Sequence, residues 1–146
     1  EIVFAWTKKE FSNLSKFEGA GVRVPHPIAF RDNVLIFELL LDGDAIAPQL
    51  KKVYAETAKP AEFLKKVVEN MRKIHKAGFV HSDLSEYNLL VSDGEPVIID
   101  CAQAVLLAHP RSKEFLERDC ENVAHFFSKK MGVKVSPADI LKRVVG

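Results

Sequence analysis

The stretch VHSDLSEYNLLV, residues 80–91, has apolar ends but carries His81, Asp83 and Asn88 between them. Asp and Asn are disfavoured in strands, and burying either side chain without a partner costs free energy. The stretch is therefore expected to form a loop between two apolar elements. We expect its polar side chains to have a chemical role that offsets this cost.

The same stretch fits the spacing H-x-D-L-x-x-x-N, which is typical of kinase catalytic loops. Asp100 ends the next apolar run, PVIID, and strand ends in a hairpin lie close together, so Asp100 is expected to face Asn88. Phosphoryl transfer needs a carboxylate to orient and deprotonate the attacking oxygen, and oxygen ligands for Mg²⁺. The pattern therefore predicts Asp83 as the catalytic base and Asn88 and Asp100 as metal ligands.

Each of these residues also has a purely structural interpretation. Asp83 and Asp100 could cap the segments that follow them, and Asn88 could occupy a left-handed turn. Their joint order, with a helix before and a glycine turn between two strands after, favours phosphotransfer. His81 is expected to pack the loop and bond to the backbone. Asp119, on a later helix, is expected to accept hydrogen bonds from the catalytic-loop backbone and so hold residues 81–83 in shape.

Working outward from this loop, the sequence predicts an α+β fold. Apolar residues at helical spacing predict helices over 5–18, 60–78 and 112–131, with a short last helix capped by Ser136. In the first helix, Trp6, Phe11, Leu14 and Phe17 form the expected apolar face. An edge strand within 22–30 and a buried strand over 33–41 form one predicted hairpin, and residues 89–91 and 97–99 form a second.

Composition restricts the class of protein further. The 146 residues carry a formal net charge of +1, so nothing draws the whole chain to nucleic acid or to membranes, and no sequence-specific nucleic-acid binding is evident. Cys101 and Cys120 lack metal-ligand spacing, which favours a reducing compartment. No signal peptide is evident, and the longest apolar run, at 34–41, contains Glu38. We expect a soluble, cytoplasmic protein of one domain.

The sequence resembles the RIO family of atypical serine/threonine protein kinases, in the subgroup with the HxDLSEYN loop. The resemblance covers nearly the whole chain. It rests on HSDLSEYNLLV (81–91), IIDCAQAV (98–105), EFLERDCENVAHFF (114–127), KEFSNL (9–14), AGVRVPHPI (20–28) and VLIFELL (34–40).

This resemblance implies a protein-kinase-like fold that uses ATP and Mg²⁺. Residues 1–41 would be a remnant of the N-lobe, with an αC-like helix, a hairpin and the hinge strand, and residues 42–146 would be the C-lobe. The backbone of Glu38 and Leu40 would bind adenine, and Glu10 would be the αC glutamate that pairs with a phosphate-binding lysine. The residue matching Asp100 would also accept phosphate, which gives an aspartyl-phosphate and ATPase-like turnover.

The resemblance also implies a role in maturation of the small ribosomal subunit, with a protein substrate or the pre-ribosomal particle as partner. The chain departs from ordinary protein kinases in two ways. Ser82 stands where arginine is usual, and Asp100-Cys101-Ala102 replaces D-F-G without a later A-P-E, so control by a phosphorylated activation loop is not expected. No nucleotide-covering loop or strand lysine precedes the first helix, so we expect a fragment with weak nucleotide binding and little turnover.

Two other interpretations remain open at this point. Small-molecule kinases of the aminoglycoside or choline type share H-x-D-x-x-x-x-N and I-D, although Gln103 and His109-Pro110 favour the RIO family. The second is a kinase-like scaffold protein without catalytic activity, which belongs to a different functional class.

Overall fold

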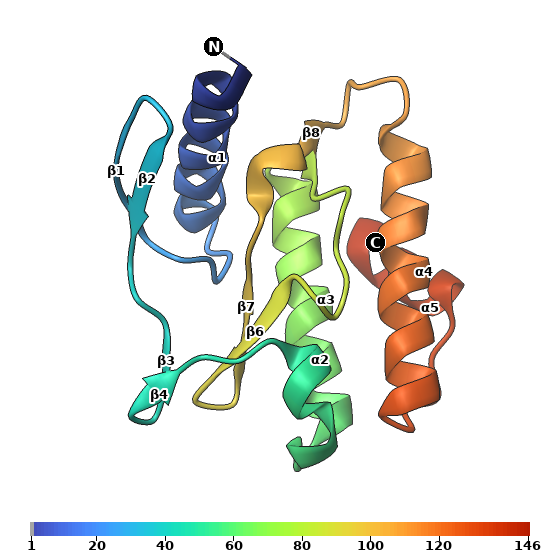
Figure 1. Ribbon diagram of the computed structural model, residues 1–146. Coiled ribbons are helices and arrows are strands. Elements are labelled where there is room, and N and C mark those ends of the chain that lie inside the picture. Colours follow the sequence, from blue (N-terminus) through green and yellow to red (C-terminus); the bar gives the residue numbers. More distant parts are fainter. Residues whose placement is uncertain (1) are drawn as a thin grey trace.

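The computed structural model describes residues 2–146, in which helices are combined with antiparallel strand pairs, as expected for an α+β fold (Figure 1). In chain order the elements are α1 (Ile2–Gly19), β1 (Pro27–Arg31), β2 (Val34–Phe37), β3 (Leu41–Asp42), β4 (Ala45–Ile46), α2 (Leu50–Val53), the 3-10 turn η1 (Tyr54–Glu56), α3 (Pro60–Lys76), β5 (Phe79–Val80), β6 (Leu89–Ser92), β7 (Glu95–Ile98), the 3-10 turn η2 (Cys101–Gln103), β8 (Val105–Leu106), α4 (Ser112–Lys130) and α5 (Pro137–Val145).

Helix α3 is the central helix of the molecule, and its prediction is confirmed. Pro60 occupies its first turn, where the missing N–H would have no helical partner. Gly78 follows it with φ +90°, a left-handed conformation that turns the chain into β5. The predicted apolar stripe is buried throughout; it consists of Phe63, Leu64, Val67, Val68, Met71 and Ile74.

The strands of the described residues form four antiparallel pairs: β1–β2, β3–β4, β5–β8 and β6–β7. The predicted second hairpin is β6–β7, in which Leu89 pairs with Ile98 and Leu90 with Val97. Its turn residues Asp93 and Gly94 both have positive φ, the geometry that matches the twist of a tight hairpin. The hairpin places the end of β7 beside the start of β6, which brings the two ends of the predicted site together.

Helices α4 and α5 complete the larger part of the molecule, and both were predicted. Helix α5 packs against α3 and α4. It begins with a capping box, in which the Ser136 hydroxyl accepts from the Asp139 N–H and the Asp139 carboxylate accepts from the Ser136 N–H. No helix within residues 2–146 combines the length and the apolar character needed to cross a membrane.

One hydrophobic core joins the first part of the chain to the rest. Leu14 and Phe17 of α1 are buried in the same cluster as the α3 stripe and the apolar face of α4. The Phe17 and Phe79 rings meet edge to face, with centroids 5.4 Å apart. Helix α1 also packs against η2, the turn that follows Asp100. The first helix is therefore held next to the end of β7.

Two expectations about the first part of the chain are wrong. The predicted buried strand over 33–41 is shorter, because β2 ends at Phe37, and most of its side chains are exposed. Trp6 is also exposed, at 49%, instead of contributing to an apolar face. Within the described residues, β1 and β2 form a two-stranded ribbon with no further strand beside it, so apolar sequence alone did not produce burial.

Candidate active site

The predicted catalytic loop, residues 81–88, connects β5 to β6 and is anchored by a carboxylate on α4. The buried Asp119 carboxylate accepts hydrogen bonds from the N–H groups of Ser82 at 2.9 Å and Leu84 at 3.0 Å. The Arg118 guanidinium donates to the Ser82 carbonyl at 2.7 Å. The expected role of Asp119 is therefore confirmed. Because Ser82 has φ +70°, these bonds hold a left-handed backbone that a non-glycine residue rarely adopts.

The electrostatics of Asp119 reflect this burial. Desolvation raises the pKa of the Asp119 carboxyl, although the two backbone hydrogen bonds and the charge of Arg118 oppose the shift. A carboxylate with few water contacts has strong hydrogen bonds to the groups that remain, since the local dielectric constant is low. Asp119 and Arg118 thus anchor the loop to α4.

His81 ties the loop to the strand end that carries Asp100. Its Nε2 lies 2.9 Å from the carbonyl oxygen of Ile99, and its Nδ1 lies 3.2 Å from the backbone N of Asp83. These partners require Nε2 to donate and Nδ1 to accept, which is the neutral form of the ring. The arrangement matches the expected structural role of His81.

Asn88 lies directly against Asp83. Its side-chain amide nitrogen donates to the Asp83 backbone oxygen at 2.7 Å and lies 3.4 Å from the Asp83 carboxylate. Its backbone oxygen accepts from the Ile99 N–H at 3.1 Å, next to Asp100. Within the described residues, no hydrogen bond involves Oδ1 of Asn88. That oxygen has the chemical character that Mg²⁺ prefers.

Asp83 and Asp100 line one cleft of about 290 Å³. Asp100 follows β7 in a left-handed conformation, with φ 56° and ψ 60°, and its side chain is exposed. Backbone strain of this kind in a non-glycine residue recurs at functional sites. The other residues that line the cleft are Trp6, Thr7, Glu10, Leu35, Ala102 and Gln103.

Glu10 brings a third carboxyl group to the same cleft from α1. Desolvation and, after it, the charge of Asp100 raise the pKa of Glu10 to about 7, while a hydrogen bond with the Cys101 backbone opposes the shift. Among the described residues, its buried Oε2 has no hydrogen-bond partner. A buried carboxyl oxygen without a partner beside a second carboxylate favours a cation in this cleft.

The described part of the chain has no cluster of three or more His, Cys, Asp and Glu side chains placed to enclose a metal ion. This is compatible with magnesium, which keeps several waters and is usually held by one or two carboxylates together with substrate phosphates. Asp100 lines the cleft with its carboxylate, whereas Asn88 is not among the lining residues and adjoins the cleft through its hydrogen bond to Asp83. The carboxylates of the cleft therefore suit Mg²⁺ that is held mainly by water and substrate phosphates.

The predicted hinge residues, Glu38 and Leu40, lie between β2 and β3 and outside this cleft. The Glu38 N–H donates to the His26 carbonyl, and the Leu40 carbonyl accepts from Ala47, each at 2.9 Å. Within residues 2–146, no hydrogen bond involves the Glu38 carbonyl or the Leu40 N–H. The two groups left over are a donor and an acceptor two residues apart, which suits the edge of a nucleobase.

The charge of Glu38 within an apolar run now has a structural explanation. Its carboxylate accepts from the Arg23 guanidinium and from the His26 N–H, each at 2.9 Å. Partial burial opposes ionisation, but these hydrogen bonds, that of His26 first, lower the pKa of Glu38 below its usual value. The side chain therefore braces the segment before β1 and is not directed at a ligand.

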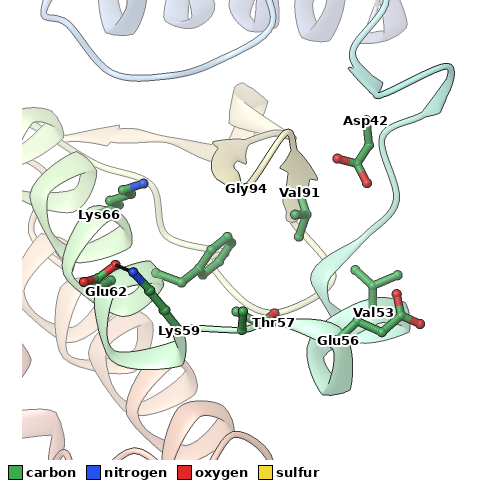
Figure 2. Close-up of a pocket in the computed structure, with 11 residues that line it drawn as sticks. Asp42, Val53, Glu56, Thr57, Lys59, Glu62, Lys66, Val91 and Gly94 are labelled. Atoms are coloured by element: carbon green, nitrogen blue, oxygen red, sulfur yellow. Dashed lines mark ion pairs between the residues drawn. The ribbon is translucent and has the colours of Figure 1, made fainter.

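A second cleft, of about 450 Å³, lies near Asp42 and the start of α3 (Figure 2). It is lined by residues of η1, the start of α3 and the β6–β7 hairpin, and it shares no residue with the Asp83–Asp100 cleft. Its lysines face acidic partners, since Lys59 lies 3.9 Å from Glu62 and Lys66 lies 2.8 Å from Glu95. It is therefore poorly suited to bind phosphate.

Sequence reasoning missed Trp6, Thr7, Leu35 and Gln103 as residues that line the cleft. A local signal existed for two of them, because Trp6 and Thr7 lie four and three positions before Glu10 and so share its side of the helix. Leu35 lies in β2 and Gln103 in η2, both far from Glu10 along the chain. Only the tertiary arrangement therefore identifies them as residues of the cleft.

A profile of the RIO domain family matches residues 1–140. The chain is 51% identical over 130 residues to the RIO-type serine/threonine-protein kinase Rio1 of Haloferax volcanii, an alignment that covers 89% of this chain and 44% of that protein. It is 40% identical over 140 residues to the RIO-type serine/threonine-protein kinase Rio1 of Thermoplasma acidophilum, covering 96% and 72%.

The crystal structure of the Rio2 kinase-ADP/Mg²⁺-phosphoaspartate complex from Chaetomium thermophilum has the same fold, with a TM-score of 0.81 at 22% identity over 98% of this chain and 44% of that one. The kinase-like fold expected from the sequence is thereby confirmed. The chain spans less than half the length of the Haloferax relative. The extent of the profile match and the identity to the Rio1 proteins show that the chain belongs to the RIO domain family.

Proposed function

We propose that this chain is the catalytic-loop part of an ATP- and Mg²⁺-dependent serine/threonine phosphotransferase. Asp83 is the base, and Asn88 and Asp100 hold the metal ion. The observation that carries the proposal is the shared cleft of Asp83 and Asp100, with the Asn88 amide bonded to Asp83. The relatives of the chain are named serine/threonine-protein kinases, which supports a protein substrate over a small molecule.

In this proposal Asp83 accepts the proton of the attacking hydroxyl group. The hydroxyl oxygen forms a bond to the terminal phosphorus of ATP while the bond from that phosphorus to the bridging oxygen breaks, and ADP leaves. The hydrogen bonds from Asn88 and the anchoring of the loop by Asp119 fix the position of Asp83, so little reorganisation is needed during the reaction. Bound Mg²⁺ neutralises charge on the phosphates. Glu38 and Leu40 bind adenine through their free backbone carbonyl and N–H.

We further propose that Asp100 serves as an alternative phosphate acceptor. One of its carboxylate oxygens forms a bond to the terminal phosphorus while the bond to the bridging oxygen of ADP breaks. Water then hydrolyses the acyl phosphate to inorganic phosphate, which completes one ATP hydrolysis. The exposure of Asp100 leaves its carboxylate accessible, and the similar Rio2 kinase was crystallised as a phosphoaspartate complex with ADP and Mg²⁺.

The division into an N-lobe remnant (1–41) and a C-lobe (42–146) is part of this proposal, as is a cytoplasmic role in small ribosomal subunit maturation. The latter rests on the family resemblance alone. Co-sedimentation of the chain with small-subunit precursors, compared with mature subunits, would test it.

Calorimetric titration with ATP tests the metal site directly. We expect heat that requires Mg²⁺ and is abolished by EDTA, and an affinity reduced at least about tenfold in Asp100→Asn, because one charge-bearing ligand is lost. Asp44→Asn, an exposed change of equal charge on the β3–β4 turn, is the matched control and should bind as the wild type does.

Turnover separates the catalytic roles from binding. Asp83→Asn should retain Mg²⁺-dependent ATP binding while losing phosphotransfer to serine or threonine, because only the proton acceptor changes.

In the calorimetric titration, equal heats of ATP binding in wild type and Asp100→Asn would contradict the metal assignment. Absence of any ATP binding would instead favour the non-catalytic scaffold.

A further inference from the structure

A third cleft, of about 690 Å³, lies between α1 and β8, and its α1 wall carries only positive charges. We call it the basic cleft. Helix α1 contributes Lys8, Lys9, Ser12, Asn13 and Lys16, whose spacing places them along one side of the helix. Among the described residues that line the cleft, none is acidic. The three lysines are exposed, so their charges are available to a ligand.

The opposite wall of the basic cleft is apolar. It is formed by Phe79, Ala104, Val105, Leu106 and Ala108, next to His109. Leu106 is 57% exposed, so this wall offers apolar surface to a ligand. Lys16 lies over the Phe79 ring, with its Nζ 5.5 Å from the ring centroid, so the charged and apolar walls meet.

His109 adds a hydrogen-bond donor and no charge. Its Nδ1 lies 3.0 Å from the backbone N of Arg111 and therefore accepts that hydrogen bond. In the resulting neutral ring, Nε2 carries the proton. Strand β8 offers further donors and acceptors, because within residues 2–146 it pairs with β5 alone and its other edge has no strand beside it.

The basic cleft is adjacent to the proposed active site along the backbone. Gln103 lines the Asp83–Asp100 cleft, and the next residue, Ala104, lines the basic cleft. Asn13 of the basic cleft donates to the carbonyl of Cys101, the residue after Asp100, at 2.8 Å. The two clefts therefore meet at the neighbouring residues Gln103 and Ala104.

We propose that the basic cleft binds an extended, acidic peptide segment that carries an apolar side chain, and so selects the protein substrate. Acidic residues pair with the three lysines, and the apolar side chain packs on Leu106 and Val105. The proposal deepens the proposed function, because it names the substrate class of the same site. A nucleic acid fits less well, since the apolar wall has aliphatic side chains and its one aromatic ring is buried and covered by Lys16.

Fluorescence anisotropy with labelled peptides tests this inference without nucleotide. The probe is a peptide of alternating glutamate and leucine. A peptide of alternating lysine and leucine reverses the charge, and one of alternating glutamate and serine removes the apolar side chains. We expect only the glutamate–leucine peptide to bind well, with an affinity that falls as salt is raised.

Two variants locate the binding. The triple change Lys8→Gln, Lys9→Gln and Lys16→Gln should weaken binding about tenfold, because each exposed ion pair contributes modestly. Its control is Lys113→Gln, Lys129→Gln and Lys130→Gln, which removes the same charge from exposed positions on α4. Leu106→Ser should also weaken binding, whereas Ile46→Ser, at the 72% exposed Ile46, should not. Circular dichroism checks that all variants fold.

Unchanged affinity in the triple α1 variant, or no binding to the wild type, would overturn the inference. Equal binding of the glutamate–serine peptide would overturn its apolar part. Displacement of the peptide by oligouridine with the same lysine dependence would show a nucleic-acid site instead. ATP binding is measured in parallel: peptide binding that persists while no Mg²⁺-dependent heat is found with ATP would sink the proposed function and leave the peptide site intact.

Discussion

Two carboxyl groups near the proposed active site, those of Asp119 and Glu10, have opposite surroundings. Asp119 has two backbone donors and supports the loop from the side away from solvent. Glu10 has a buried oxygen without a partner among the described residues and faces the proposed metal ligand Asp100. The first carboxyl group therefore stabilises the fold, while the second is costly until a cation is present.

Replacing Asp119 by alanine should leave the N–H groups of Ser82 and Leu84 without an acceptor. Each unsatisfied buried donor costs about 1–3 kcal/mol, so we expect the free energy of unfolding in urea to fall by about 2–4 kcal/mol. Asp119→Asn should cost less, because the amide oxygen still accepts. Glu117→Ala, on an exposed position of the same helix, serves as control. A loss of unfolding free energy no larger than that of the control would mean that the loop keeps its conformation without the Asp119 hydrogen bonds.

The raised pKa of Glu10 predicts a pH dependence of stability. Its pKa is about 7 in the folded chain and 4.5 ordinarily, so between these values the folded state binds more protons than the unfolded state. The free energy of unfolding should therefore fall as pH rises from about 4.5 through 7. After allowance for solvent screening of a partly exposed group, the loss is on the order of 1–2 kcal/mol.

Urea unfolding at several pH values in EDTA buffer measures this effect. Glu10→Gln cannot ionise and should lack that part of the decline, whereas the exposed control Glu69→Gln should retain it. If the unfolding free energy of wild type and of Glu10→Gln declined in parallel with pH, the Glu10 carboxyl would be exposed to water and not buried in the cleft.

Among the secondary-structure elements, those with strong local signals were predicted best. Helix α3 has proline at its start, glycine after its end and an unbroken apolar stripe, so three independent signals agree. Helix α5 has its capping box. By contrast, several elements have only two to four residues each, which is too few for a periodic pattern to be recognised; these are β3, β4, β8 and α2.

The capping box of α5 offers a test at this level. Ser136→Ala removes the acceptor for the Asp139 N–H, at 3.1 Å, and should lower the free energy of unfolding by about 1 kcal/mol. Ser128→Ala, inside α4, is the control, because its hydroxyl bonds only to a carbonyl of its own helix. Equal effects of the two changes on the urea midpoint would argue against the cap.

For the molecule as a whole, the shared core predicts a single unfolding transition. Phe17 of α1 is fully buried against Phe79, so Phe17→Ala should cost about 3–5 kcal/mol through lost burial and the cavity left behind. Val3→Ala on the same helix should change stability by less than about 0.5 kcal/mol, because Val3 is small and mostly exposed.

Fluorescence and far-ultraviolet circular dichroism should report the same urea midpoint in wild type and in Phe17→Ala. Separate midpoints would indicate that residues 1–41 unfold independently of the remainder.

The order of residues along the chain was enough to predict α3, the β6–β7 hairpin, α4, α5 and the loop that carries Asp83 and Asn88. Those predictions rest on neighbours within a few positions, and local spacing sets both helix faces and turn geometry. The role of Asp119 was also accessible, since its place near an apolar helix face implied burial.

The tertiary structure alone decided which distant groups converge. Glu10 and Asp100 are ninety positions apart, and their proximity follows from the packing of α1 against η2. The exposure of β2 depended on which elements lie beside it, and the basic cleft arises where α1 passes β8. Burial and long-range charge depend on all neighbours in space, which no local pattern of residues contains.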